Sequence, residues 1–201
     1  MSHETRLSSA PRPAWLSPFR QAARWLRRLR GPRPAPEYLA EFPPPPHVVD
    51  HPGVQVVVIS NDTISGDNSA PWVPADNQYF EIGSAEEMVA LLEAGHAPGS
   101  IDVLILGGHG ERAGAGIRAI AWETGEEVYI NQAMDEGLAA RLRQRLRGEA
   151  EVYIAACGSG GDQGLMRELA RKLGCRVTAT PGCVYADYSA DAPWVTVAPD
   201  A

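Results

Sequence analysis

Three short apolar runs constrain the fold of this chain more than any other feature of its sequence. They span residues 54–60, 101–106 and 152–156, and they consist almost entirely of apolar or β-branched residues. Strands that bury both faces are typical of the middle of a parallel sheet that other elements cover. The runs therefore predict an α/β fold with a mainly parallel central sheet.

Two segments between these runs have the pattern of amphipathic helices. Ser84 precedes the first as a candidate N-cap, Glu87 stands at the capping-box position, and Gly95 is expected to end the helix. The second segment repeats leucine every four residues over positions 138–146, with arginines between them. Both helices are expected to cover the sheet.

A third helix is expected over residues 163–173, with Asp162 as its N-cap and Gly174 at its C-terminal end. Strand and helix patterns alternate along the chain, and sequences of this kind fold as layered α/β domains. We therefore predict a three-layer sandwich.

The remaining segments predict shorter elements. Residues 117–122 and 127–130 read as a small hairpin, while residues 176–180 and 194–197 read as two further strands. The segment 71–83 is expected to be an irregular loop.

An N-terminal arm differs in kind from the rest of the chain. Residues 1–46 are rich in proline, and residues 1–36 hold eight arginines and one glutamate, a net charge of +7 in a chain whose total is −7. An amphipathic segment within this arm is typical of a membrane-surface contact, a partner-binding or targeting arm, or a pro-segment. The domain is expected to span residues 47–201. It is too acidic to bind nucleic acid through its body.

The three cysteines stand at irregular spacing without a CxxC pair. This pattern indicates neither a disulfide framework nor a zinc site, and we expect no metal and no cofactor. The sequence shows no apolar run long enough to span a membrane and no secretory signal. A cytoplasmic protein is expected, with export into another cell left open.

Cys157 is the strongest candidate for a reactive side chain. It follows the apolar run 152–156 directly and precedes a glycine-rich turn that leads into the helix at residue 163. The positive end of a helix dipole favours an anion, so this position favours the thiolate form of Cys157.

His109 occupies the same kind of position after another buried run. The run 101–106 ends in Gly107, Gly108, His109 and Gly110. Neighbouring parallel strands lie about 4.8 Å apart, and open α/β sheets bind ligands at the carboxyl ends of their strands. A Cys157/His109 dyad is therefore predicted at that edge.

These two strand ends resemble those of the caspase-like superfamily of cysteine peptidases, clan CD, which includes caspases, legumains, gingipains and the self-cleaving domains of bacterial toxins. In those proteins one apolar strand ends in His-Gly, as at His109-Gly110 here, and a later one ends in Ala-Cys, as at Ala156-Cys157. The separation of 48 residues is close to the ~50 of caspases. The resemblance covers roughly residues 50–200.

The resemblance implies a caspase-like fold and a cysteine endopeptidase that hydrolyses peptide bonds through a covalent acyl-enzyme. It implies that Cys157 is the nucleophile, that His109 is the base or proton donor, and that the N–H groups of Gly110 and Cys157 form the oxyanion hole. The substrate is then a protein or peptide. The basic arm is expected to act as a pro-segment of a zymogen or to contact a membrane surface or partner protein.

Substrate specificity departs from that of caspases. Ala155 stands where caspases have glutamine, and Ser159 stands where they have glycine, so cleavage after aspartate is not expected. Ala155 is a candidate substrate-binding residue, and Asp62, Asp187 and Asp191 are candidates for an acidic pocket that binds a basic side chain.

Other functions remain open at this stage. A non-catalytic caspase-like module or a small-ligand-binding α/β domain, recruited by its basic arm, is the main alternative. A weaker one is a phosphate cradle formed by Gly158, Gly160 and Gly164. Cys175 and Cys183 are expected to be structural, and His96 is expected to be solvated.

Overall fold

Six strands form one mixed sheet in the part of the chain that the structure describes. The computed structural model describes residues 42–43, 51–64, 78–110, 116–121, 123–185 and 189–199. The strands of the sheet are β1 (Gln55–Ser60), β2 (Gln78–Ile82), β3 (Ile101–Gly107), β6 (Leu146–Ala155), β7 (Arg176–Ala179) and β8 (Val195–Val197).

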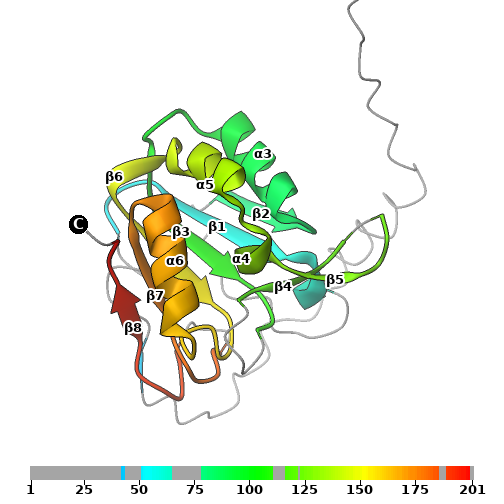
Figure 1. Ribbon diagram of the computed structural model, residues 1–201, viewed down its shortest axis with the longest axis vertical. Coiled ribbons are helices and arrows are strands. Elements are labelled where there is room, and N and C mark those ends of the chain that lie inside the picture. The colour runs from blue at the N-terminus through cyan, green and yellow to red at the C-terminus, as the bar shows by residue number, and fades with distance from the viewer. Residues whose placement is uncertain are drawn as a thin grey trace, which may run out of the picture. The chain divides into compact units, whose positions relative to one another are not determined.

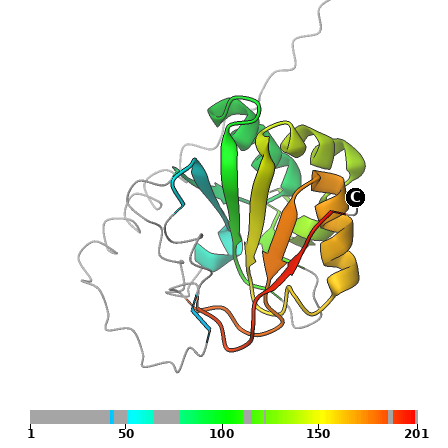
Figure 2. The ribbon, with the colours of Figure 1, turned by 90° about the vertical axis from the view of Figure 1, so that its left-hand side faces the viewer.

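The strand order is β2-β1-β3-β6-β7-β8, and only the last pair, β7 and β8, is antiparallel. Figure 2 shows β1, β3, β6, β7 and β8 side by side in that order, from cyan to red. The three apolar runs thus become the adjacent strands β1, β3 and β6. The predicted α/β class and mainly parallel sheet are confirmed.

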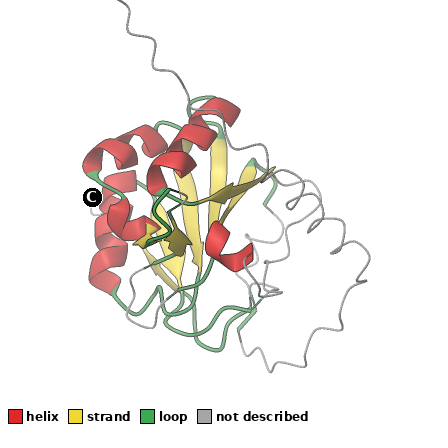
Figure 3. Ribbon diagram, turned by 90° about the vertical axis from the view of Figure 1, so that its right-hand side faces the viewer, coloured by secondary structure: helices red, strands yellow, loops and turns green. Residues whose placement is uncertain are grey.

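The described α-helices lie on one face of this sheet (Figures 1 and 3). They are α3 (Ala85–Gly95), α4 (Ile130–Ala133), α5 (Glu136–Arg143) and α6 (Gln163–Leu173). Their buried residues form one apolar cluster with alternate residues of the central strands, such as Val56, Leu104 and Ile154. The intervening residues, such as Val57, Ile105 and Tyr153, form a second buried cluster on the opposite face. A covering layer on that second face, and with it the three-layer arrangement, stays a prediction.

Helix α3 begins and ends where the sequence predicts. The Ser84 hydroxyl accepts a hydrogen bond from Glu87 N at 3.1 Å, and Gly83 N donates to the Glu87 carboxylate at 2.8 Å. This reciprocal capping satisfies backbone donors that have no partner within the helix. His96 is the C-cap residue.

Helix α6 also follows its prediction. The Asp162 carboxylate accepts hydrogen bonds from Gly164 N at 2.8 Å and Leu165 N at 3.1 Å. At the other end, Gly174 adopts a left-handed conformation with φ of 65°, which glycine reaches without strain.

The predicted helix over residues 138–146 is wrong at its end. Helix α5 stops at Arg143, and Leu146 is the first residue of β6, where it pairs with Ile101 of β3. The leucine period continues into the strand by coincidence. Residues from Leu146 onward form a strand because pairing with β3 gives hydrogen-bond partners to their backbone N–H and C=O groups.

The prediction of a loop over residues 71–83 is wrong for its last part, since residues 78–82 form the parallel edge strand β2. Residues 71–77 lie outside the described residues. Strand β2 is short and stands at the sheet edge. Its sequence therefore lacks the continuous apolar run that marks a strand buried on both faces. Its pairing with β1 is a tertiary effect.

The predicted hairpin is confirmed as β4 (Arg118–Ile120) and β5 (Glu127–Tyr129), which pair antiparallel apart from the main sheet. A 3₁₀ turn, η1 (Asn61–Ile64), follows β1. The Asn61 side chain donates from Nδ2 to Ile120 O, and its Oδ1 accepts a hydrogen bond from Ile120 N. The hairpin is thereby fastened to the end of β1.

Most of the predicted arm, residues 1–41 and 44–46, lies outside the described residues, and its boundary stays a prediction. Phe42 forms an antiparallel bridge with Ala190, donating from its N at 3.2 Å and accepting from Ala190 N at 2.9 Å. In the described ranges, no helix combines the length and apolar character that crossing a membrane requires.

Candidate active site

The sheet brings His109 and Cys157 to the same edge. Strands β3 and β6 are parallel neighbours, and Gly107 pairs with Ala155 at their carboxyl ends. His109 and Cys157 each stand two residues beyond this last pair, so they occupy equivalent positions on adjacent strands. The register of β3 and β6 therefore favours the predicted approach of His109 and Cys157 at one sheet edge.

The backbone contacts at this edge are close. A Cβ atom placed on Gly110 would clash with the carbonyl oxygen of Cys157 and stand 2.8 Å from its nitrogen. Only glycine has no atom at that place. The segment that carries His109 therefore lies directly against the backbone of the cysteine.

The Cys157 sulfur lies against the backbone of Val184. The N–H group of Val184 donates to Cys157 Sγ at 3.3 Å, and Sγ lies 3.9 Å from the carbonyl oxygen of the same residue. A backbone donor of this kind stabilises negative charge on sulfur. Helix α6 begins at Gln163, six residues further along, so the nearest donor to the sulfur comes from a different loop than the sequence suggests.

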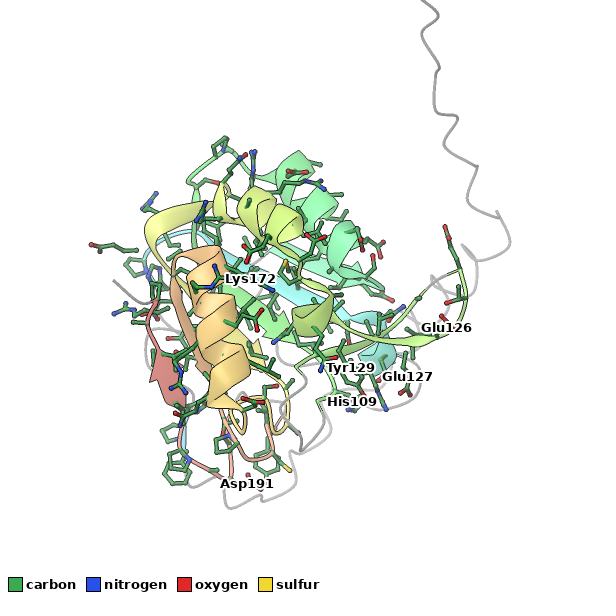
Figure 4. All side chains as sticks on the ribbon, in the orientation of Figure 1. His109, Glu126, Glu127, Tyr129, Lys172 and Asp191 are labelled. Carbon is green, nitrogen blue, oxygen red and sulfur yellow. The ribbon has the colours of Figure 1, made fainter. Side chains whose placement is uncertain are left out.

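The hairpin β4–β5 positions the backbone of His109. Arg118 N donates to the carbonyl oxygen of His109 at 2.8 Å, and Arg118 pairs with Tyr129 across the hairpin. Figure 4 labels His109 in the same part of the view as Tyr129 and Glu127 of β5. Within the described ranges, the His109 ring has no hydrogen bond, and none joins it to Cys157. Catalytic hydrogen bonds often shorten only when substrate binds.

The N–H groups of Gly110 and Cys157 make no hydrogen bond to another described residue. They belong to backbone segments that touch each other. Donors of this kind suit an oxyanion hole, because a developing negative charge needs preorganised N–H groups that nothing else occupies.

The glycine-rich turn after Cys157 is tied to the end of β7. Gly158 N donates to Gly182 O at 2.7 Å, and Gly160 N donates to Thr180 O at 2.8 Å. A phosphate cradle needs such N–H groups to face the ligand. Because two of them already bind protein carbonyls, the turn is poorly suited to be a phosphate cradle.

A cavity of about 280 Å³ opens beside Cys157. It is lined by Cys157, Gly158, Pro181, Gly182, Cys183 and Asp191. Asp191 accepts a hydrogen bond from Cys183 N at 2.6 Å, which fixes its carboxylate at the wall of the cavity. Figure 4 shows Asp191 on the loop at the lower edge of the view. One of the three predicted acidic residues therefore lines the same cavity as the nucleophile candidate.

The other predicted substrate-binding residues lie elsewhere. The Asp62 carboxylate forms an ion pair with the Arg118 guanidinium at 2.8 Å, and this bond is the main cause of the raised pKa of Arg118. Ala155 packs in the buried cluster on the sheet face opposite the helices. Asp187 lies outside the described residues.

The sequence predicts a loop over residues 181–193, but not its contact with the Cys157 sulfur. The Thr180 hydroxyl donates to Ala192 O at 3.0 Å and accepts from Gly182 N at 3.2 Å, so one buried side chain shapes the loop that brings Val184 and Asp191 to the sulfur. Backbone donors such as Val184 N leave no mark on the sequence, since any residue except proline supplies them. In the sequence, only Thr180, at the end of the predicted strand 176–180, offered a signal of how this loop is held.

Cys175 and Cys183 differ in burial, since Cys175 is buried and Cys183 is partly exposed. Burial raises the pKa of the Cys175 thiol to about 12, which fits the structural role expected for it. Cys183, also expected to be structural, lines the cavity beside Cys157. The prediction that His96 is solvated is wrong: it is only 8% exposed at the C-cap of α3, because a cap residue can be buried by the fold whatever its polar sequence context.

Among the described residues, no group of three or more His, Cys, Asp or Glu side chains is arranged to hold a metal ion. A scan of the chain against protein-family models finds no match, and a search of curated proteins finds none either. The site is therefore interpreted from its own geometry.

Proposed function

We propose that this chain is a cysteine endopeptidase of the caspase-like type, with Cys157 as the nucleophile and His109 as the proton-transfer group. The observation that carries the proposal is the register of β3 and β6, which sets both residues two positions past the pair Gly107 and Ala155. Acyl transfer by a thiol needs a nearby imidazole and N–H donors for the oxyanion, and all three belong to this sheet edge.

The reaction proceeds through a thioester. The Cys157 thiolate attacks the carbonyl carbon of the peptide bond, and the electron pair of the C=O bond moves to oxygen, toward the N–H groups of Gly110 and Cys157. When the C–N bond breaks, the imidazolium of His109 gives its proton to the leaving amine. Water then attacks the thioester after losing a proton to His109, which releases the carboxylate product and the free thiol.

The cavity beside the sulfur supports a preference for basic side chains. Asp191 places a carboxylate on its wall, and Lys and Arg side chains bind most strongly where a fixed carboxylate meets them. Asp62 does not share this role, because its carboxylate binds the Arg118 guanidinium and does not line the cavity. We therefore propose cleavage after lysine or arginine.

The activity is tested with an electrophilic peptide probe that ends in a basic residue. We expect one label per chain, no label on Cys157→Ala, and labelling at least tenfold slower on His109→Ala, since general acid–base groups contribute roughly 10²–10⁴-fold. Cys183→Ala is the matched control, because it removes a second thiol from the same cavity. An inert Cys157, or labelling that depends on Cys183 instead, contradicts the proposal and favours the non-catalytic binding module.

The specificity is tested separately with a random peptide pool. Wild-type protein is expected to cut after Lys or Arg, and Asp191→Asn is expected to lower kcat/KM for those sites at least tenfold, the equivalent of about 1.4 kcal/mol. Glu149→Gln, which changes an exposed carboxylate on β6 outside the cavity, is the control. If the Asp191→Asn variant still prefers to cut after Lys or Arg, other residues form the specificity pocket. That result does not contradict the roles proposed for Cys157 and His109.

A further inference from the structure

Two of the three cysteines border the cavity of the candidate active site. Cys157 follows β6, and Cys183 belongs to the loop that follows β7. Because β6 and β7 are parallel neighbours, the chain leaves both strands at the same edge of the sheet, at the lower end of the view in Figure 2. Both cysteines are partly exposed. A small solute that enters the cavity therefore meets both of them.

Two hydrogen bonds hold the segments of these cysteines together. Gly158 N donates to Gly182 O at 2.7 Å, and Val184 N donates to the Cys157 sulfur at 3.3 Å. The first bond involves the residue before Cys183, and the second involves the residue after it. Cys183 is thus held on both sides against the chain at Cys157.

The bond from Val184 also fixes how far apart the two cysteines are. In a planar trans peptide, the N–H bond points to the same side as the Cα atom of the preceding residue, which is Cys183 here. Standard bond lengths then place the Cys157 sulfur about 4 Å from the Cys183 Cα, and the two Cα atoms within about 7 Å of each other. Disulfides form between cysteines whose Cα atoms are closer than about 7 Å. The backbone therefore permits a bridge between them.

The surroundings of the two sulfur atoms give them different chemical roles. The N–H group of Val184 stabilises negative charge on the Cys157 sulfur. The Asp191 carboxylate accepts a hydrogen bond from Cys183 N at 2.6 Å, so it adds negative charge beside Cys183 and disfavours a second anion there. Oxidants attack the thiolate form of cysteine, so Cys157 reacts first and Cys183 is placed to resolve the product.

Cys175 offers an internal comparison in the same chain. It is 3% exposed, and burial raises the pKa of its thiol to about 12. It directly precedes β7, at the opposite end of that strand from the loop of Cys183. Cys175 is therefore expected to stay a thiol under conditions that oxidise Cys157.

We propose that Cys157 and Cys183 form a reversible disulfide when the protein meets a peroxide. The Cys157 thiolate attacks one oxygen of the peroxide, the O–O bond breaks, and the departing hydroxide takes up a proton to become water. The Cys183 sulfur then attacks the sulfenic acid on Cys157. The S–O bond breaks, and hydroxide leaves as water with the proton of Cys183. The two thiols thereby lose two electrons to the peroxide.

The disulfide has a consequence for the candidate active site. While it exists, the Cys157 sulfur cannot attack a peptide bond, and it cannot be oxidised further to the irreversible sulfinic acid. This regulatory role rests on the proposed peptidase function. The formation of the disulfide does not depend on that function, because it requires only the two sulfur atoms and the peroxide.

Mass spectrometry of the full-length chain tests the bond directly. The protein is treated with hydrogen peroxide, alkylated with N-ethylmaleimide and digested with trypsin without a reductant. Cleavage after Lys and Arg places the three cysteines on separate peptides, 148–167, 173–176 and 177–201. We expect peptides 148–167 and 177–201 to be joined and two hydrogen atoms lighter than their sum, with peptide 173–176 alkylated. Dithiothreitol before alkylation should return all three peptides to the alkylated form.

Cys183→Ala tests the resolving role through the recovery of Cys157. After peroxide and then dithiothreitol, wild-type Cys157 is expected to regain alkylation and peptide-probe labelling to the level of its untreated sample. In Cys183→Ala both should be lost permanently, because the sulfenic acid proceeds to the sulfinic acid, which dithiothreitol does not reduce. Cys183→Ser, which replaces only the sulfur atom, should behave in the same way. Cys175→Ala removes the third thiol instead and is the control that should recover like wild type.

Three outcomes would overturn the proposal: no joined peptide, with wild-type Cys157 oxidised as irreversibly as in Cys183→Ala; a peptide joined through Cys175; or a bridge between two chains, seen as a dimer on a non-reducing gel. Failure of the peptidase proposal has a different signature. If the peptide probe labels no reduced protein, the peptidase proposal fails, whereas the joined peptide and the alkylation of Cys157 still decide whether the disulfide forms.

Discussion

At the scale of single residues, Gly110 packs directly against the backbone of the candidate nucleophile. Its Cα lies where a side chain would strike the backbone of Cys157. The contact explains how a histidine and a cysteine 48 positions apart are held at one sheet edge. It also makes the glycine testable.

We expect Gly110→Ala to destabilise the protein by about 1–3 kcal/mol, because backbone atoms rather than a flexible side chain must move aside. Labelling of Cys157 by the peptide probe should slow at least tenfold, since the oxyanion donors separate. Urea unfolding and the labelling rate measure the two effects. Gly148→Ala, where an added Cβ meets nothing within 4 Å, should change stability by less than about 0.5 kcal/mol. Equal behaviour of the two variants would contradict the close contact.

The buried His96 predicts a dependence of stability on pH. Burial lowers the pKa of His96, so the folded protein favours the neutral ring. The stabilisation from this residue is complete above the unfolded pKa of about 6.5 and is lost as the pH falls through and below that value. We expect the free energy of unfolding to fall between about pH 7.5 and about pH 5.5.

The matched variant His96→Gln, which cannot titrate, is expected to show a smaller fall over the same range. Urea unfolding at each pH gives the comparison. The carboxylate of Glu93 on the same helix does not confuse it, because the Arg141 side chain lowers the pKa of Glu93 and moves its titration to more acidic conditions. Parallel pH profiles for wild type and variant would show that the imidazole is not the titrating group.

At the scale of elements, the turn between β6 and α6 connects the nucleophile to a rigid helix. Gly158 and Gly160 bind the turn to the segment that follows β7, and Asp162 at the end of the turn caps α6. The cavity lined by Cys157 and Asp191 borders this turn. The position of this turn therefore depends on the Asp162 cap of α6.

Asp162→Ala is expected to lower the free energy of unfolding by about 1 kcal/mol, because two N–H groups at the start of α6 lose their acceptor. Asp162→Asn keeps an oxygen acceptor at the same place and should retain most of that stability. Urea unfolding of the three proteins measures the difference. If the Asn variant lost as much stability as the Ala variant, the charge acting on the helix dipole, and not the hydrogen bonds, would be the source.

At the scale of the whole molecule, the bridge between Phe42 and Ala190 connects the end of the predicted arm to the loop that holds Asp191 and Val184. Ala190 also pairs with Val184, whose N–H group meets the Cys157 sulfur. Residues near the N-terminus thus contribute main-chain hydrogen bonds to a loop of the candidate active site.

Two truncations separate this contact from the rest of the arm. A chain lacking residues 1–38 keeps the bridge, whereas one lacking residues 1–46 loses its two hydrogen bonds. We expect the longer truncation to be about 1–3 kcal/mol less stable than the shorter one, at roughly 0.5–1.5 kcal/mol for each bond. Chemical denaturation measures the difference, and the labelling rate of Cys157 shows whether the loop is disturbed. Equal stability of the two chains would mean that the bridge contributes nothing.

The sequence alone determined the α/β class, the parallel centre of the sheet and the ends of α3 and α6. These follow from local rules: buried strands are apolar on both faces, and caps are chosen by residues within a few positions. It also indicated which histidine and which cysteine stand at strand ends, because each follows an apolar run directly.

Only the tertiary structure decided the rest. Strand β2, the start of β6 at Leu146 and the burial of His96 depend on which segments pair or pack, and those partners are remote in the sequence. The contact of Val184 N with the Cys157 sulfur depends on a loop shaped by Thr180. Likewise, Asp191 lines the cavity at Cys157, whereas Asp62 pairs with Arg118. Local preferences act over a few residues, whereas register, burial and charge pairing are set by contacts between distant parts of the chain.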